Sequence, residues 1–465
     1  ARIDWKYALN LALTDPGFDH TVLSEFRGRL LSGQAEERLL NHMLEQFKAK
    51  GWLKSRGQQR TDSTHVLAAV RKLNRLECVG ETVRQVLDAL AQEAPEWLLS
   101  QITLDWFDRY GVRFEGYRLP KEKAEQEALQ RQIGADGWHL LSAIYGTQAP
   151  VKLRTLFEVE LMRQIWLQQY YVQDGQVTWR DKENLPPHSL LIQSPYDPEA
   201  RNRTKRTLNW SGYTAHLTET CDEDRPNLIV NVETTPATTA DIKVLNQVHT
   251  HLDKKELLPR EHLVDTSYVD GTHLHTSQSR YGVDLFGPVP PNSTWQTKAG
   301  QGFDLSCFVI DWQTQTVTCP QGRLNRTWLP VQNSQGNPVI QVHFQQTDCQ
   351  VCACRSQCTQ SKTGPRTLQF KPRLEFEALQ TARQRQQTHQ FKQTYNKRAG
   401  IEGTISQATR AFDLRRSRYI GLAKTHLQHI ITAVAINFTR VWAWLNDMPK
   451  APTRRSKFLA LAPVY

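Results

Sequence analysis

Apolar residues recur every three to four positions over most of the first fifty residues, which is the spacing of one face of a helix. Asp19 or Thr21 can cap a first helix, in which Leu23, Phe26 and Leu30 share a face. A second helix over about 35–50 places on one face Leu39, Leu40, Met43, Leu44 and Phe47. The pair suits a helix-turn-helix or a helical cap, so we predict an N-terminal helical region over 1–57.

The pattern changes to that of a strand over 58–67, a short β-compatible segment that contains Asp62. A lone aspartate in such a segment is usually a turn or cap residue, and we interpret His65 as a packing residue. From about 67 to 171 helical spacing returns, in one stripe of Val83, Val86, Leu87 and Leu90 and another of Leu153, Leu156, Phe157, Val159, Leu161 and Ile165. We predict a first strand within 58–75 and a helical insertion over 76–185.

Strand patterns return after the insertion, and their order predicts the fold class. They lie at 189–195, 211–218 and 227–233, followed by a helix over about 239–252 and by strands at 261–268 and 283–288. Without the insertion, this is the order of an RNase H-like domain, in which helices flank a mixed sheet. We therefore predict a mixed α/β fold with its sheet core over 186–290. Asp62 and Asp265 would end neighbouring strands, and Asp270, in a turn, is the alternative to Asp265.

Cysteines mark a second insertion, a polar segment over 291–370 with short strand patterns. The chain has eight cysteines, of which Cys349, Cys352, Cys354 and Cys358 lie close together. A C-x2-C pair with two further thiols can bind zinc tetrahedrally and can fold a small region that lacks its own core. We predict a structural Zn²⁺ site that includes Cys349, Cys352 and Cys358, with Cys354 as a surplus thiol and His343 as an alternative ligand. Unrelated cysteines are the other interpretation.

A carboxylate and a guanidinium one turn apart characterise the C-terminal part, 371–448. After a predicted helix over 370–394, Tyr395, Arg398 and Glu402 fall on one helical face. Taken alone, Arg398 and Glu402 suit an ion pair on a solvated helix. A basic run follows, consisting of Arg410, Arg415, Arg416, Arg418 and Lys424. A last helix over 419–445 has a broad apolar face that should pack on the sheet and that includes Ile430, Ile431, Phe438 and Trp442. A basic tail spans 449–465.

The spacing Tyr395-x2-Arg398-x3-Glu402 resembles the signature around the last acid of the DDE transposases of bacterial insertion sequences. From 2–8 to 415–422 the chain resembles the subgroup in which two large insertions, one helical and one cysteine-rich, separate the acids. The resemblance implies that Asp62, Asp265 and Glu402 are catalytic and bind Mg²⁺ or Mn²⁺, and it adds Cys319 as the fourth zinc ligand. Related groups carry a lysine seven residues after the glutamate, where this chain has Thr409 followed by Arg410. The resemblance also implies a further helical stretch before residue 1, so the N-terminal region is expected to be truncated.

The charge of the chain favours a polyanionic partner. Its 465 residues carry 58 Lys and Arg against 47 Asp and Glu, a formal charge of +11. Nucleic acid is the first candidate, for which the N-terminal helices offer a binding region, and a membrane surface is the second. The longest apolar run, 430–445, is interrupted by Asn437 and Arg440, and the N-terminus lacks a signal-peptide pattern. We predict a bacterial, cytoplasmic, nucleoid-associated protein without a membrane partner.

These features together predict a transposase that cleaves DNA and transfers strands at the ends of its insertion sequence. Its partners would be double-stranded DNA, both terminal inverted repeats and target, and a second copy of the chain in a homodimer on DNA. Arg398 would hold a phosphate near the scissile bond, Tyr395 would line the same groove, and the basic run would contact phosphates regardless of sequence. Two alternatives stay open: a catalytically inactive or domesticated transposase-derived DNA-binding protein, and an RNase H-like nuclease without strand transfer.

Overall fold

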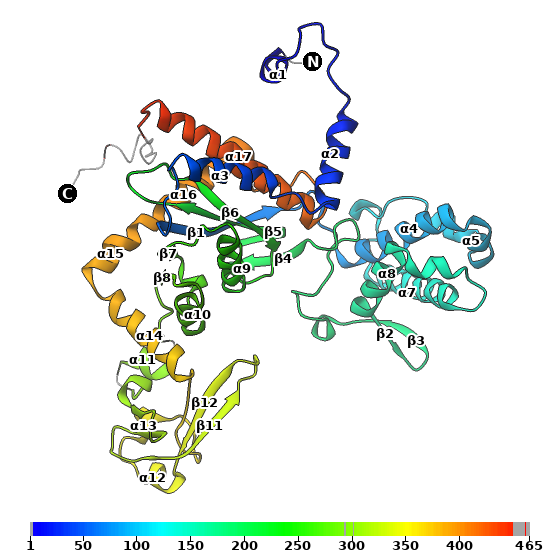
Figure 1. Ribbon diagram of the computed structural model, residues 1–465. Helices are drawn as coiled ribbons and strands as arrows, with labels where there is room; N and C mark the ends of the chain where they lie inside the picture. The colour runs from blue at the N-terminus through cyan, green and yellow to red at the C-terminus, as the bar shows by residue number, and fades with distance from the viewer. Residues whose placement is uncertain (1–2, 293, 301, 450–460, 462–465) are drawn as a thin grey trace.

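The computed structural model describes residues 3–292, 294–300, 302–449 and 461, and Figure 1 shows their arrangement. Three helices open the chain: α1 (Ile3–Ala8), α2 (His20–Ser32) and α3 (Arg38–Ala49). Asp19 caps α2 by accepting a hydrogen bond from the backbone of Thr21 at 2.8 Å. The apolar face of α3 is buried, with the exception of Leu39. α2 extends away from the sheet, so Leu23 and Phe26, which share a helical face as predicted, are exposed.

A six-stranded mixed sheet lies at the centre of the molecule (Figure 1). Its strands are β1 (Gln58–Leu67), β4 (Arg201–Lys205), β5 (Leu208–Thr220), β6 (Ile229–Pro236), β7 (Glu261–Val264) and β8 (Asp284–Phe286). β5 pairs with β4, β6 and β1 in antiparallel register, whereas β1, β7 and β8 are parallel. The predicted mixed α/β fold is therefore confirmed, and β4 is an additional strand.

The alternation of side chains along β1 separates the two faces of the sheet. Thr61 lies on one face, where it contacts His262 at 2.6 Å, and His262 in turn contacts His249 of α9 (Asp241–Lys254) at 2.9 Å. α10 (Gly271–Tyr281) lies on the same side as α9 (Figure 1). Arg60 and Asp62 point to the opposite face, which the C-terminal helices cover. The alternation thus places Asp62 beneath these helices.

The first insertion is a helical unit with its own core. It consists of α4 (Arg75–Glu93), α5 (Pro95–Gln101), α6 (Asp105–Tyr110), α7 (Lys123–Tyr145), α8 (Phe157–Gln169) and the hairpin of β2 (Tyr170–Gln173) and β3 (Gln176–Trp179). Val83, Ile133 and Ile165 are among its buried residues. Pro95 starts α5, and glycines follow α6 and α7, so the region predicted to be helical over about 67–171 is helical but divided into separate helices.

The strand expected over 189–195 is wrong, because this fully described segment is irregular. Leu191 and Ile192 are buried, as their apolar character predicts, but their segment packs against the helical insertion. Its backbone is satisfied by side chains: Gln168 accepts a hydrogen bond from Ile192 at 2.9 Å and donates one to Leu190 at 3.0 Å. A buried apolar run can therefore look like a strand without pairing.

The second insertion is a small β-rich unit that lies apart from the central sheet (Figure 1). It consists of α11 (Trp295–Ala299), β9 (Val309–Asp311), β10 (Thr316–Thr318), β11 (Asn325–Gln332), β12 (Pro338–Phe344), α12 (Gln346–Gln350), α13 (Arg355–Cys358) and β13 (Thr367–Phe370). β11, β12 and β13 form an antiparallel sheet. Its apolar cluster is modest and includes Val342, Phe344 and Phe370.

The C-terminal part consists of α14 (Arg373–Gln386), α15 (His389–Asn396), a 3₁₀ turn η6 (Lys397–Ala399), α16 (Gly400–Phe412) and α17 (Leu422–Leu445). The single helix expected over 370–394 is divided, because Thr388 caps a new helix by accepting a hydrogen bond from Phe391 at 3.1 Å. α17 buries Ile430, whereas Ile431, Phe438 and Trp442 are exposed.

Two further expectations concern the ends of the chain and the membrane. The predicted basic tail falls almost entirely on 450–460 and 462–465, outside the described residues. Among the described residues, no helix is both long enough and apolar enough to cross a membrane.

Candidate active site

The two aspartates predicted to lie on neighbouring strands are adjacent in the sheet. Parallel pairing aligns Thr61 of β1 with Val264 of β7. The residues that directly follow these two are Asp62 and Asp265. The Asp265 side chain accepts a hydrogen bond from the backbone of Thr266 at 2.7 Å, just beyond the strand. Asp62 departs from the prediction, because β1 continues beyond it and the residue lies inside its strand.

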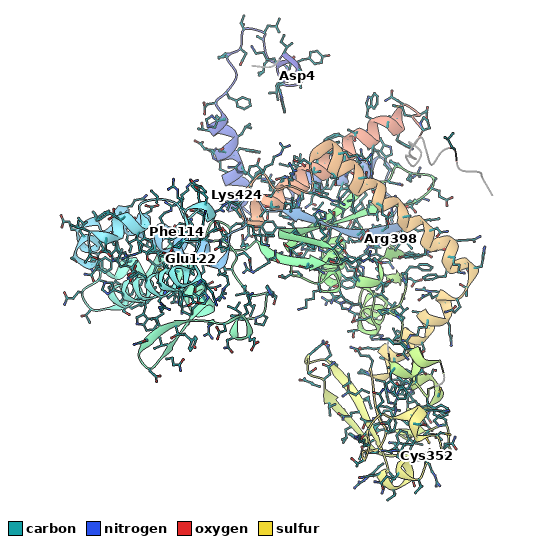
Figure 2. The ribbon with its side chains drawn as sticks, turned by 180° about the vertical axis from the view of Figure 1, so that it is seen from behind. Asp4, Phe114, Glu122, Cys352, Arg398 and Lys424 are labelled. Carbon is teal, nitrogen blue, oxygen red and sulfur yellow. The ribbon has the colours of Figure 1, made fainter. Side chains whose placement is uncertain are left out.

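Arg398 connects Asp62 with Glu402. Its Nη2 lies 2.6 Å from Asp62 Oδ2, and its Nη1 lies 3.4 Å from Glu402 Oε1. The continuous helix expected here is interrupted by η6, which contains Arg398 between α15 and α16. The guanidinium therefore stands between two carboxylates, on the face of the sheet that the C-terminal helices cover. Figure 2 labels Arg398 on these helices.

Asp62 is mostly buried, whereas Glu402 is open to solvent. Their side chains are 17% and 68% exposed, respectively. Burial raises the pKa of Asp62 to about 6; Arg398 opposes this effect, and the negative charge of Asp265 adds to it. A carboxylate in this position is stabilised by a nearby cation, and in the structure that cation is Arg398.

Replacing Arg398 by alanine is expected to raise the pKa of Asp62 above about 6. Burial would still disfavour the charged carboxylate, and the positive charge that now opposes this effect would be lost. A ¹³C NMR titration of aspartate-labelled, metal-free protein measures the change. Arg418→Ala removes an exposed arginine of the basic run and should leave the titration unchanged. A pKa that stays constant or falls in Arg398→Ala would contradict the contact between Arg398 and Asp62.

Tyr395 is held beside the acids by aromatic packing. Its ring stacks on Phe391, with the centroids 5.6 Å apart, and is half-buried. Burial raises the pKa of its hydroxyl; the charge of Arg398 opposes this effect, and the charges of Asp265, Asp62 and Glu402 add to it. The stacking on Phe391 thus fixes the phenol on the helix that leads into Arg398 and Glu402.

A groove of about 430 Å³ opens beside Asp62 and Glu402. Arg410 and Arg415 line it as well, together with Thr64. Arg415 is fixed there by a hydrogen bond from its Nε to Thr64 Oγ1 at 2.9 Å, and its backbone pairs with the end of β1. Two cations of the basic run thus share a groove with two of the acids.

The remaining cations of the basic run lie on open surface. Arg416, Arg418 and Lys424 are exposed, and none of the three is among the described residues that line the groove. Figure 2 places Lys424 near the beginning of α17, well away from Arg398. The basic run is therefore divided between the groove and the surface beside it.

The donor atoms at this site suit a hard divalent cation, because carboxylate oxygens are the ligands that Mg²⁺ and Mn²⁺ prefer. Burial lowers the pKa of Arg398, but the charges of Asp62, Asp265 and Glu402 raise it, and the net effect is a raised pKa. Among the residues that the structure describes, no three His, Cys, Asp or Glu side chains lie close enough to hold one metal ion. Arg398 lies between Asp62 and Glu402 and keeps their carboxylates apart. The donor set fits the metal, and Arg398 or Glu402 would have to move to admit it.

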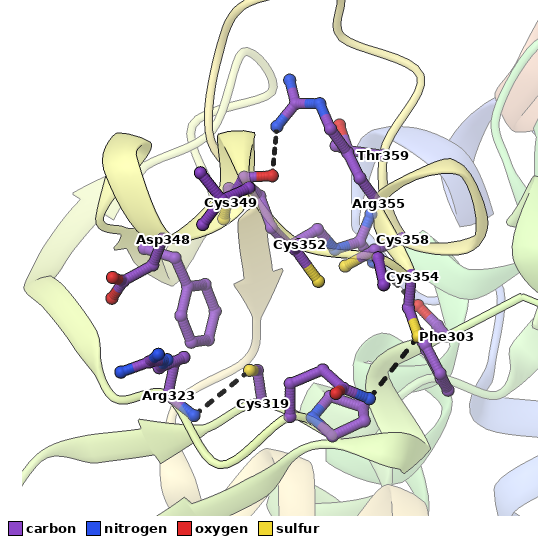
Figure 3. Close-up of a pocket in the computed structure, with 16 residues that line it drawn as sticks. Phe303, Cys319, Arg323, Asp348, Cys349, Cys352, Cys354, Arg355, Cys358 and Thr359 are labelled. Carbon is purple, nitrogen blue, oxygen red and sulfur yellow. Dashed lines mark hydrogen bonds between the residues drawn. The ribbon is translucent and has the colours of Figure 1, made fainter.

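Cysteines line a separate pocket of about 240 Å³ in the second insertion (Figure 3). They are Cys319, Cys349, Cys352, Cys354 and Cys358. The sulfur atoms of Cys352 and Cys358 are directed into the pocket (Figure 3). Burial raises the pKa of Cys358 to about 11, and Cys349, Cys319 and Cys352 add to the shift. Cysteine sulfur is a preferred zinc ligand, so the donor chemistry of the pocket fits zinc. Among the described residues, no three of these thiols lie close enough to hold one ion, so the cysteines would have to move together to bind it.

The alternative residues considered from the sequence occupy other positions. Asp270 caps α10 by accepting a hydrogen bond from the backbone of His273 at 2.8 Å. His343, in β12, directs its two ring nitrogens to Thr367 and Gln341, each at 3.1 Å. It is not among the described residues that line the cysteine pocket. These contacts favour Asp265 over Asp270 and the cysteines over His343.

Arg60 also borders the site, although no motif in the sequence points to it. It lies two positions before Asp62 on the same face of β1 and donates a hydrogen bond to the carbonyl of Lys397, the residue before Arg398. Its position in the sequence could have indicated this role. Arg60 lies two positions before Asp62 in a predicted strand, and a buried arginine needs a hydrogen-bond or charged partner.

Comparison with known families links the C-terminal part of the chain to transposases. Residues 318–442 match a family described as a transposase DDE domain. The match contains Arg398, Glu402 and the five cysteines of the pocket, whereas Asp62 and Asp265 precede it. It supports a DDE transposase, a class of nucleic-acid-processing enzymes, and through that class DNA as a partner. A search of curated proteins found no match to the chain.

Proposed function

We propose that this protein is a transposase that cleaves DNA at the ends of its own insertion sequence and joins the freed strands to target DNA. The place of the three acids carries the proposal. Asp62 and Asp265 are adjacent across a parallel strand pair, and Glu402 lies on the other side of Arg398. The family match around Arg398 and Glu402 supports the same function.

The order of the strands supports an RNase H-like catalytic domain. β6, β5, β1, β7 and β8 follow one another across the sheet, with β5 antiparallel to both of its long neighbours. The helical insertion separates β1 from the rest of the sheet in sequence, and the cysteine-rich insertion separates β8 from α14. This division supports the subgroup of DDE transposases whose acids are split by two insertions.

Asp62, Asp265 and Glu402 would hold two Mg²⁺ or Mn²⁺ ions. When bound, these ions lower the pKa of an attacking water or 3′-hydroxyl and stabilise the departing 3′-oxygen. The protein supplies a rigid and an adjustable part of the site. Hydrogen bonds from the backbone of Ser63 and Thr266 orient Asp62 and Asp265, whereas Glu402 projects from an exposed helical face.

Cations around the groove would hold the DNA backbone. Arg410 and Arg415 line the groove, and a guanidinium can contact one phosphate with two parallel hydrogen bonds. Arg398 would contact a phosphate near the scissile bond once the acids have other partners, and Tyr395 would stack or hydrogen-bond in the same place. Arg416, Arg418 and Lys424 would add contacts that weaken with salt.

We also propose that Cys319, Cys349, Cys352 and Cys358 bind a structural zinc ion. The second insertion has only a modest apolar cluster among its described residues, and a zinc–thiolate site can supply the missing folding energy. Cys354 would remain a free thiol beside the metal; it accepts a hydrogen bond from Gln321 at 3.5 Å.

Purified protein is expected to contain about one zinc ion per chain, as measured by inductively coupled plasma mass spectrometry. Cys352→Ser should remove most of the zinc and lower the melting temperature, because the metal binds only the folded insertion. Cys307→Ser removes an exposed cysteine that does not line the pocket and is the matched control. Less than half an equivalent of zinc, with melting unaffected by a chelator, would argue for unrelated cysteines.

The function is tested with duplexes taken from the DNA on either side of the coding sequence, mixed with full-length protein, a target plasmid and Mg²⁺ or Mn²⁺. Joined products support the proposal. Nicking without joining would favour a nuclease, and binding without nicking would favour an inactive transposase-derived protein. The mass of the protein–DNA complex shows whether two copies assemble on the DNA, as we propose.

A further inference from the structure

A buried ionic cluster lies beneath the C-terminal helices. Glu219 of β5 is fully buried, and each of its carboxylate oxygens lies 2.6 Å from an arginine: Oε1 from Arg60 Nη2, and Oε2 from Arg440 Nη1. Arg60 is paired with Glu219 across the β1–β5 ladder, and Arg440 comes from α17. One carboxylate therefore joins three elements that are distant in sequence.

The cluster also reaches the helix that carries Glu402. Thr404 lies two residues after Glu402 in α16 and is buried. Its hydroxyl donates a hydrogen bond to Glu219 Oε2 at 2.6 Å and accepts one from Arg440 Nη2 at 2.6 Å. The buried side of α16 is thus fixed by charge-assisted hydrogen bonds, which have a narrow range of geometry.

The same cluster holds the turn that carries Arg398. Arg60 donates a hydrogen bond to the carbonyl of Lys397, the first residue of η6. Gly400 leaves room for this contact, because a Cβ at that position would overlap the Arg60 guanidinium. Arg60 and Thr404 therefore hold the two ends of a segment that contains both Arg398 and Glu402.

Apolar packing alone would leave the position of this segment less defined. Ile401, Ile405 and Ala408 of α16 are buried in the core, but apolar contacts are non-directional and permit small rotations and shifts. A displacement of about 1 Å at a catalytic group can reduce the rate about 100-fold. A fixed hydrogen-bonded anchor removes this freedom.

We propose that Glu219 is a positioning residue: through Arg60, Arg440 and Thr404, it sets Arg398 and Glu402 relative to Asp62. The inference rests on the proposed function, in which Glu402 acts at the metal site. Its test therefore combines catalysis with hydrogen–deuterium exchange, a measurement that does not depend on catalysis.

Full-length Glu219→Gln and a pair of variants at Thr404 provide the test. Thr404→Val, which removes the hydroxyl at similar size, should increase amide exchange in 397–408 about tenfold and reduce kcat of DNA cleavage about 10- to 100-fold, at unchanged DNA affinity. Thr404→Ser, which keeps the hydroxyl, should restore both. Glu219→Gln should show the larger effect, since it leaves two buried arginines without a counter-charge.

Asp136→Asn is the matched control. Asp136 is another buried carboxylate that accepts a hydrogen bond from an arginine, Arg109 Nε, at 2.9 Å, but it lies within the helical insertion. This variant should leave exchange in 397–408 unchanged. The inference is overturned if exchange in this segment is the same in Thr404→Val and wild type, or if Asp136→Asn changes it equally. If Glu219→Gln does not fold, the Thr404 pair decides. If Thr404→Val alters exchange but the wild-type protein never cleaves DNA, the positioning role of Glu219 is supported and the proposed function is rejected.

Discussion

Replacing Glu402 by glutamine is expected to reduce metal-dependent cleavage of element-end DNA by about three orders of magnitude or more. A metal ligand contributes several kcal/mol of transition-state stabilisation, at about 1.4 kcal/mol per factor of ten in rate. Glutamine keeps the size of the side chain and removes the charge that would hold the metal. Binding to the same DNA should change by less than about twofold, because a metal ligand acts on the chemical step. Gel-resolved cleavage and fluorescence anisotropy measure the two effects.

The fold should tolerate this substitution. The Glu402 side chain is 68% exposed and contacts Arg398 at 3.4 Å, so its loss should change the free energy of unfolding by less than about 1 kcal/mol. Glu377→Gln is a matched control, since Glu377 of α14 is also an exposed glutamate paired with an arginine four residues away, Arg373. An active Glu402→Gln enzyme would exclude Glu402 as a metal ligand.

The sheet was largely predictable because its strands combine β-compatible residues with turn signals between them. The segments around Asp62 and Asp265 are strands in the structure, and the alternation within β1 places Arg60 and Asp62 on one face. The errors arose where local pattern and tertiary contact disagree. Leu191 and Ile192 are apolar and buried, but their segment forms no strand and Ile192 packs on the helical insertion. Trp442 is apolar and lies on α17, but it is exposed.

The site was predictable only in part, because its members are separated widely in sequence. Tyr395, Arg398 and Glu402 lie close together in the sequence, so the family signature that they form could be recognised without a structure. The structure adds that Arg398 faces Asp62 and that η6 interrupts the helix, neither of which the spacing indicates. The Glu219 cluster could not be read from the sequence at all. Its partners lie 159 and 221 positions away, and only the fold brings them together.

Asp265→Asn should likewise abolish cleavage, by about three orders of magnitude, whereas Asp270→Asn should stay within about threefold of wild type. The two substitutions are chemically identical and five residues apart. Asparagine can still accept the backbone hydrogen bonds that the two aspartates receive from Thr266 and His273. The N-cap of α10 should therefore survive in Asp270→Asn. A large difference in cleavage rate between the two variants would then show that the negative charge is needed at Asp265 and not at Asp270.

The register of the sheet gives the reason to expect this difference. Asp265 follows directly after the last paired residue of β7 and is adjacent to Asp62, while Asp270 begins the next helix and pairs with His273 at 2.8 Å. Cleavage rates at saturating Mg²⁺ and Mn²⁺, with melting temperatures of both variants, separate loss of catalysis from loss of fold. If Asp270→Asn were inactive and Asp265→Asn active, the second carboxylate of the site would be Asp270. The metal would then have to bind away from the β1–β7 pair, and adjacency in the sheet would no longer explain the site.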